Sequence, residues 1–130
     1  MLHRLAPSGA MVEYMHYILS TQCRVKPGMM EDFLRDVQQW EETAMASTHA
    51  PEYHAVYLRR SDPSYALVVT QFLNKEQADG FGATGLLENF HERVMSCVVE
   101  TPNAEAYDLY YGIGPAGPRV VFGEETGSDR

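Results

Sequence analysis

Cysteine, positive charge and long apolar runs are all scarce in this chain of 130 residues. Its two cysteines, Cys23 and Cys97, are far apart in the sequence, which favours two buried free thiols over a disulfide framework. No window approaches the ~18 uninterrupted apolar residues that a membrane span needs. Residues 1–13 also lack the apolar centre of a secretory signal. The sequence therefore predicts a cytoplasmic protein without a membrane segment.

Positive charge is outnumbered by negative charge, with ten Lys and Arg against eighteen Asp and Glu and a formal net charge of −8. A nucleic-acid surface requires clustered cations, and anionic membranes attract basic segments. We therefore expect neither nucleic acid nor a membrane among the partners.

Motifs for metals and common cofactors are missing as well. Neither HxxxH nor HxH spacing joins the histidines, which argues against a structural zinc site. The glycines Gly80, Gly82 and Gly85 follow a helical segment and not a strand, so they do not form a phosphate-binding loop. The sequence predicts no metal, flavin or nicotinamide site.

What is present suffices for one domain, because 45% of the residues are hydrophobic and the length allows a core without disulfides or metals. We assign the domain to residues 14–114, between a loose leader (1–13) and a tail (115–130) rich in Gly, Pro and charge. Within the tail, the apolar triplet Val120-Val121-Phe122 is either a clip onto a neighbouring strand or subunit, or a chance cluster.

Hydrophobic periodicity predicts the elements of this domain. Residues 14–25 form a strand with apolar groups on both faces. An amphipathic helix follows, with Pro27 at its start and an inward stripe of Met30, Phe33, Val37, Trp40 and Ala44. Residues 52–60 and 65–73 form an antiparallel hairpin. Asn74 and Gln77 mark the start of a short helix, a second helical piece runs from Leu86 through Val98, and residues 103–113 form the last strand.

This order predicts an α+β fold of the ferredoxin-like βαββαβ type, with a four-stranded antiparallel sheet and helices on one face. The second face would then carry an apolar patch too large to leave in water. We assign to that patch His16, Ile18, Val56, Leu58, Leu67 and Val69. A homodimer that packs sheet on sheet would cover it.

Two segments add a family resemblance to this order. The junction Val25-Lys26-Pro27-Gly28 before the first helix, and the run from Phe72 to Ala78 after the third strand, resemble the antibiotic biosynthesis monooxygenase family. The resemblance spans roughly residues 14–114 and implies a dimeric α/β barrel. Members of the family include cofactor-independent oxygenases of aromatic polyketides, haem-degrading oxygenases and proteins with other small-molecule roles, and a shared fold does not select among these.

The haem-degrading members carry an axial His on the last helix, a Trp about ten residues before it and an Asn on the first strand. Those places hold His91, Phe81 and Thr21 here. The ligand matches and its two partners do not, which argues against haem degradation more than against haem binding.

His91 is the leading candidate for a functional residue, because it borders the apolar face of its helix between Leu87 and Val94. Three hypotheses remain for it: a half-buried structural histidine, a base in an aromatic pocket, and a haem ligand. An imidazole in an apolar cavity can take a proton near neutral pH, as oxidation of a phenolic or anthrone-like substrate requires.

The other candidates would line the same pocket. Trp40 offers an indole N–H to a ligand oxygen, and Tyr17 and Thr21 offer hydroxyls from the first strand, although core packing explains all three as well. A kink at the glycines would bring Phe81 towards His91, with Phe90 beside it.

These observations lead to one hypothesis and two alternatives. The first is a cofactor-independent monooxygenase that oxidises an aromatic small molecule such as a polyketide-type anthrone, with His91 as its catalytic residue. The alternatives are a haem-binding protein with His91 as the axial ligand, and a non-catalytic dimer that binds a small molecule or a partner protein.

Overall fold

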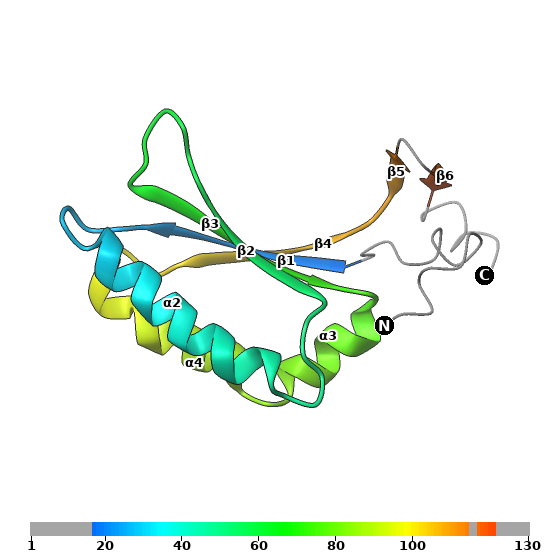
Figure 1. Ribbon diagram of the computed structural model, residues 1–130, viewed down its shortest axis with the longest axis horizontal. Coiled ribbons are helices and arrows are strands. Elements are labelled where there is room, and N and C mark those ends of the chain that lie inside the picture. The colour runs from blue at the N-terminus through cyan, green and yellow to red at the C-terminus, as the bar shows by residue number, and fades with distance from the viewer. Residues whose placement is uncertain (1–16, 115–116, 122–130) are drawn as a thin grey trace.

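Strands and helices follow one another in the order that the sequence predicts (Figure 1). The computed structural model describes residues 17–114 and 117–121. Along the chain the elements are β1 (Tyr17–Arg24), α2 (Met30–Met45), β2 (Tyr53–Leu58), β3 (Tyr65–Phe72), α3 (Lys75–Gly82), α4 (Leu86–Val94), the 3-10 helix η2 (Met95–Cys97), β4 (Asn103–Asp108), β5 (Tyr111–Gly114) and β6 (Gly117–Val121). The predicted leader and most of the predicted tail lie outside the described residues.

The main sheet has four strands in the order β2-β3-β1-β4, and each neighbouring pair is antiparallel. The helices α2, α3 and α4 all cover one face of this sheet (Figure 1). Both features confirm the predicted ferredoxin-like α+β fold. Among the helices of the described ranges, none is long and apolar enough to cross a membrane.

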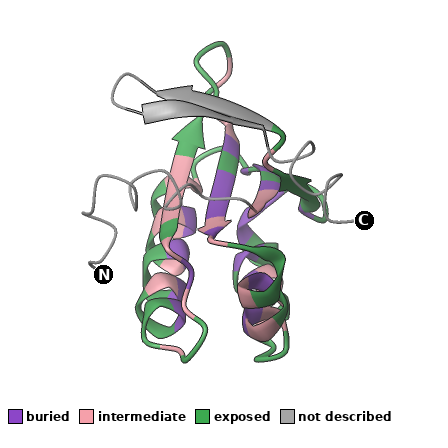
Figure 2. Cartoon of the chain, turned by 90° about the vertical axis from the view of Figure 1, so that its right-hand side faces the viewer, coloured by how far each residue is buried: buried purple, intermediate pink, exposed green. Residues whose placement is uncertain are grey.

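The first helix forms where its apolar stripe predicts it. Phe33, Val37, Trp40 and Ala44 are all buried against the sheet, and Glu31 and Asp32 lie in the first turn, where a helix dipole favours acidic groups. These helical residues, with strand residues such as Cys23 and Phe72, form the hydrophobic core between the two layers (Figure 2).

The second helical region is divided into two helices by a turn at residues 83–85. Asn74 caps α3 as predicted, because its side chain accepts a hydrogen bond from the Gln77 N–H at 2.8 Å. Gly85 has a φ of 81°, a left-handed conformation that glycine adopts without strain, and it starts α4. The helix predicted through Val98 ends earlier, at Val94, since Val98 pairs with Val25 in an isolated bridge.

The last predicted strand, 103–113, is also interrupted. It is divided into β4 and β5, and β5 pairs with β6 in a separate two-stranded sheet. Val120 and Val121 belong to β6, with Val121 opposite Tyr111, while Phe122 lies outside the described residues. Two members of the predicted apolar triplet therefore pair with a neighbouring strand.

The open face of the sheet differs from the prediction in two residues, and a further predicted member, His16, lies outside the described residues. Val56 and Leu58 pair with Val68 and Ala66, two buried residues of the helix-covered side, so assigning them to the open face was wrong. The opposite phase of β2 is apolar too, and alternation alone does not say which phase faces the helices. By the register, the open face carries Ile18, Tyr53, Ala55, Tyr57, Leu67, Val69 and Tyr107.

Candidate functional site

A cavity of about 120 Å³ lies between the sheet and the helices α2 and α4. We call it the central cavity. Its lining residues come from all four strands of the main sheet and from both helices: Leu19, Thr21, Trp40, His54, Val68, Thr70, Leu87, Phe90, His91 and Ala104. Four of the six predicted site residues line it, namely Thr21, Trp40, Phe90 and His91.

The floor of the central cavity is formed by two rows of side chains that run across the sheet. One row places His54 opposite Thr70, with Leu19 next in line, and the other places Thr21 between Val68 and Ala104. Thr21 and Thr70 are only 5% and 4% exposed. Two buried hydroxyls and one imidazole are therefore available on a floor whose other side chains are apolar.

Trp40 forms an apolar wall of the cavity. Its indole N–H donates a hydrogen bond of 2.7 Å to the Leu86 carbonyl, so the nitrogen predicted to hold a ligand is already engaged. The ring lies 5.1 Å from those of Phe90 and His54, measured between centroids. Trp40 thus joins α2 to the start of α4 and fixes the width of the cavity.

Tyr17 and Phe81 lie outside the central cavity. Tyr17 lines a neighbouring cavity of about 190 Å³, together with Phe72, Ala78 and Gly82. Phe81 is fully buried and packs between Trp40 and Phe72, with ring centroids 6.0 and 5.7 Å away. The glycine turn therefore does not bring Phe81 to the cavity that His91 lines.

His91 projects from α4 at the cavity wall, as its spacing predicts. The residue is half-buried, and its ring packs edge-on against Phe90 at 5.9 Å. Within the described residues, no hydrogen bond fixes the orientation of its imidazole.

A second histidine, His54, lines the same cavity, and no local sequence pattern points to it. Its side chain is 3% exposed, and Nδ1 lies 2.5 Å from the Glu41 Oε2 atom on α2. Nε2 is buried and has no hydrogen-bond partner in the part of the chain that the structure describes. His54 and Glu41 are 13 positions apart and lie on different elements, so no short sequence motif contains both.

Such a pair can act on protons. A neutral imidazole carries one N–H and one lone pair, and a carboxylate accepts but does not donate hydrogen bonds. If Nδ1 holds the hydrogen, Nε2 is a free acceptor inside an apolar cavity. The negative charge of Glu41 would also stabilise the ring after Nε2 takes a proton.

Comparisons with known proteins give the fold and not the reaction. No protein-family model matches the sequence, and no curated protein matches it. Solved structures of proteins named as candidate antibiotic biosynthesis monooxygenases do match. One from Bordetella bronchiseptica is 18% identical with a TM-score of 0.59, and the match covers 72% of this chain and 97% of that one. A second, from Nitrosomonas europaea, is 15% identical with a TM-score of 0.60 and coverages of 73% and 99%.

A third matching structure, of a candidate antibiotic biosynthesis monooxygenase from Caulobacter crescentus, is 11% identical with a TM-score of 0.61. The match covers 78% of this chain and 97% of that one. The chain has the antibiotic biosynthesis monooxygenase fold. The predicted resemblance to that family is confirmed at the level of the fold, and these low identities transfer no residue roles.

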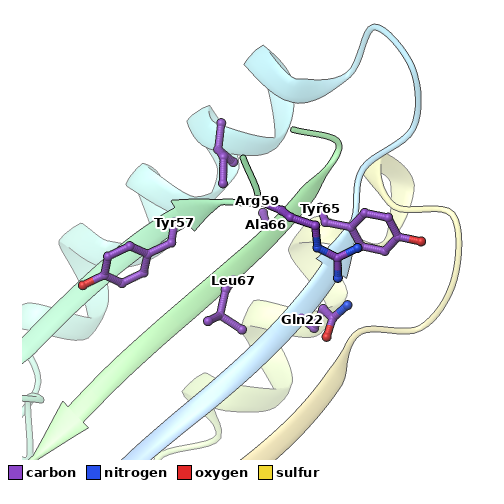
Figure 3. Close-up of a pocket in the computed structure, with 7 residues that line it drawn as sticks. Gln22, Tyr57, Arg59, Tyr65, Ala66 and Leu67 are labelled. Carbon is purple, nitrogen blue, oxygen red and sulfur yellow. The ribbon is translucent and has the colours of Figure 1, made fainter. Parts of the chain in front are cut away.

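A third hollow lies on the open face of the sheet. This groove measures about 250 Å³ and lies at one end of β2 and β3, where Tyr57, Leu67 and Gln22 project from neighbouring strands (Figure 3). The Arg59 guanidinium lies 3.9 Å from the centroid of the Tyr65 ring. The groove is thus more exposed and more basic than the central cavity.

The positive charge near this groove is partly neutralised by an acidic side chain, Asp62. Hydrogen bonds from the side chain and backbone of Ser64 hold the pKa of Asp62 below its ordinary value, and Arg24 and Arg59 lower it further.

In the described residues, no three His, Cys, Asp or Glu side chains converge in a geometry that could hold a metal ion.

Proposed function

We propose that the protein is a cofactor-independent oxygenase that acts on a small phenolic molecule in the central cavity. The observation that carries the proposal is the lining of this cavity: apolar walls, two buried hydroxyls and two imidazoles. An apolar pocket with a few convergent polar groups is the usual form of a small-molecule site.

The size of the cavity limits the substrate. An apolar cavity of roughly 150 Å³ is known to hold one benzene molecule. At about 120 Å³, the central cavity has the scale of a single ring, whereas an anthrone has three fused rings. We therefore narrow the predicted aromatic substrate to a one-ring phenol.

The reaction would follow from removal of one proton. A base of the cavity takes the phenolic proton, and the electron pair left on oxygen makes a ring carbon nucleophilic. That carbon bonds to O₂ and forms a peroxide anion, which takes a proton back from the base. Loss of the ring hydrogen with cleavage of the O–O bond releases water and leaves a quinone, so phenol and O₂ become quinone and water. Thr21 and Thr70 are positioned to donate hydrogen bonds to the oxyanion.

Resorcinol and ¹⁸O₂ test this proposal directly. We expect the purified protein to consume one O₂ per resorcinol and to place one ¹⁸O atom in a hydroxyquinone, detected by mass spectrometry. A three-ring anthrone serves as the comparison and should react poorly because it exceeds the cavity. Turnover of the anthrone without turnover of any one-ring phenol would overturn the proposed substrate class.

The haem-binding alternative fits the central cavity less well. A haem has four pyrrole rings in one plane, and the cavity that His91 lines holds about one ring. Titration with haemin, read at the Soret band beside His91→Ala, checks the alternative. A one-to-one complex that His91→Ala abolishes would restore it.

The same proposal includes a homodimer formed through the open face of the sheet. Leu67, Tyr57 and Tyr107 are 38%, 52% and 55% exposed on that face, and monomeric proteins seldom leave such patches in water. Packing of two sheets face to face would bury these side chains and leave the helix-covered cavities of both copies accessible.

A further inference from the structure

We infer that His54, oriented by Glu41, is the group that accepts the substrate proton, in place of the His91 that sequence spacing suggests. This inference rests on the proposed function, because it names the base of the same site. It assigns two residues that no local sequence pattern selects.

The two ring nitrogens of His54 have different surroundings. Nδ1 of His54 lies 2.5 Å from the Glu41 Oε2, within hydrogen-bonding distance of a carboxylate oxygen. An ionised carboxylate can only accept, so the pair favours the tautomer with the hydrogen on Nδ1. Nε2 is then left with its lone pair directed away from Glu41.

Nε2 of His54 lacks a hydrogen-bond partner in the described residues. A buried polar atom without a partner costs free energy, and native proteins keep few of them outside functional sites. Nε2 of His54 is buried without a partner in the described residues, and His54 lines the central cavity. A ligand O–H in that cavity would supply the missing partner.

His54 and His91 differ in how firmly the described residues hold their rings. Both rings line the cavity, but only His54 has a partner that fixes its tautomer and orientation. Trp40 adds to this by packing at 5.1 Å against the His54 ring. A base held in one orientation loses less entropy in reaching the transition state than a freely rotating one.

The central cavity around the His54 ring contains few titratable side chains. Of the titratable side chains around it, Glu41 comes from α2 and His91 from α4, and the other residues that line the cavity are uncharged. In the proposed step, the substrate O–H bond breaks and an Nε2–H bond forms. The electron pair stays on the substrate oxygen, and the new imidazolium is held by the Glu41 carboxylate until the proton passes to the peroxide.

The tautomer can be tested without any substrate. In protein labelled with ¹⁵N-histidine, we expect the NMR spectrum of neutral His54 to show a protonated Nδ1 and a bare Nε2. On addition of phenol as the probe, the Nε2 signal of His54 should shift and that of His91 should move less. A neutral His54 with the hydrogen on Nε2 would overturn the inference, and so would a phenol response confined to His91.

Kinetics with resorcinol give the second test. His54→Gln should reduce kcat by about 100-fold or more, the usual contribution of a general base, whereas His91→Gln, at the wall of the binding cavity, should act mainly on KM. Glu41→Gln keeps an oxygen acceptor but removes the charge, and should reduce kcat by about 10- to 100-fold. Glu42→Gln is the matched control, because it makes the same change at an exposed position on the same helix.

The two proposals fail in different ways. If no one-ring phenol is oxidised, the proposed function fails, while the tautomer and the shift on phenol binding still show whether His54 is the acceptor. If resorcinol is oxidised and His91→Gln abolishes turnover while His54→Gln does not, the function stands and the assignment to His54 is wrong.

Discussion

Cys23 shows how strongly a single position in this core is controlled by burial. The residue is fully buried on β1, and burial raises the pKa of its thiol from 9.0 to about 12. Cys97 is buried as well, and its pKa is also raised, mainly for the same reason. The thiolate is the reactive form of cysteine, so both thiols should be inert in the folded protein.

We therefore predict that iodoacetamide does not alkylate Cys23 at pH 8 until the protein unfolds, as measured by mass spectrometry. A pKa raised by folding also means that the unfolded state releases this proton first. The contribution of Cys23 to the free energy of unfolding is then complete below about pH 9 and is lost as the pH rises towards 12. Rapid alkylation of Cys23 under native conditions would contradict this prediction.

For single residues, the sequence predicts which side chains line the cavity better than it predicts what those side chains do chemically. The helical spacing around His91 correctly predicts a position at a cavity wall, because spacing along one helix is local information. His54 and Glu41 meet only after α2 packs across β2, so their pairing depends on tertiary structure. The sequence suggests Trp40 as a ligand contact because of its indole N–H. That N–H already donates to the Leu86 carbonyl, a partner distant in sequence that no local pattern reveals.

At the scale of elements, α3 is a helix whose glycines have different surroundings. A Cβ added at Gly80 would lie 2.7 Å from Cγ of the His49 side chain, which is closer than real Cβ contacts allow. A Cβ at Gly82 would meet nothing within 4 Å, and neither glycine has a left-handed φ. The close approach of His49 therefore explains why position 80 is a glycine, while no contact requires a glycine at position 82.

We predict opposite effects for alanine at these two positions. Gly82→Ala should raise the free energy of unfolding by up to about 1 kcal/mol, because alanine loses less backbone entropy than glycine on forming a helix. Gly80→Ala should lower it by about 1 kcal/mol, since displacing His49 outweighs that gain. Urea denaturation measures both, and His49→Ala combined with Gly80→Ala should recover the loss. Equal effects at the two sites would rule out the His49 contact as the cause.

The sequence predicts which segments form helices and which form strands, but it does not predict every residue at which they end. The cap at Asn74 is a local signal and was correct. The end of α4 at Val94 was missed because the apolar pattern continues through Cys97 and Val98, which are buried for another reason: Val98 bridges to Val25. A periodic pattern shows that residues are buried, but it does not show which element buries them.

On the scale of the whole molecule, the two faces of the sheet differ in their cover. The helices bury one face, while on the other the side chains of Tyr57, Leu67 and Tyr107 stay largely exposed. The sequence predicted an apolar second face from alternation, yet it placed Val56 and Leu58 there because the phase of β2 depends on its register with β3.

The open face leads to a prediction about association. We expect the protein to sediment as a dimer at micromolar concentration, and the double variant Tyr57→Glu with Leu67→Lys to sediment as a monomer, because charged groups would be buried in the interface. Gln38→Glu, on the exposed side of α2, is the control and should leave the dimer intact. A wild-type protein that remains monomeric at every concentration would exclude the proposed interface.

The position of Trp40 has one more consequence. It is the only tryptophan of the chain, and its ring stands at the cavity wall beside the His54 ring. Indole fluorescence is sensitive to a neighbouring imidazolium and to replacement of water by an aromatic molecule. The emission of the unlabelled protein therefore reports from the cavity itself, so that ligand entry and protonation of His54 can be followed optically in real time.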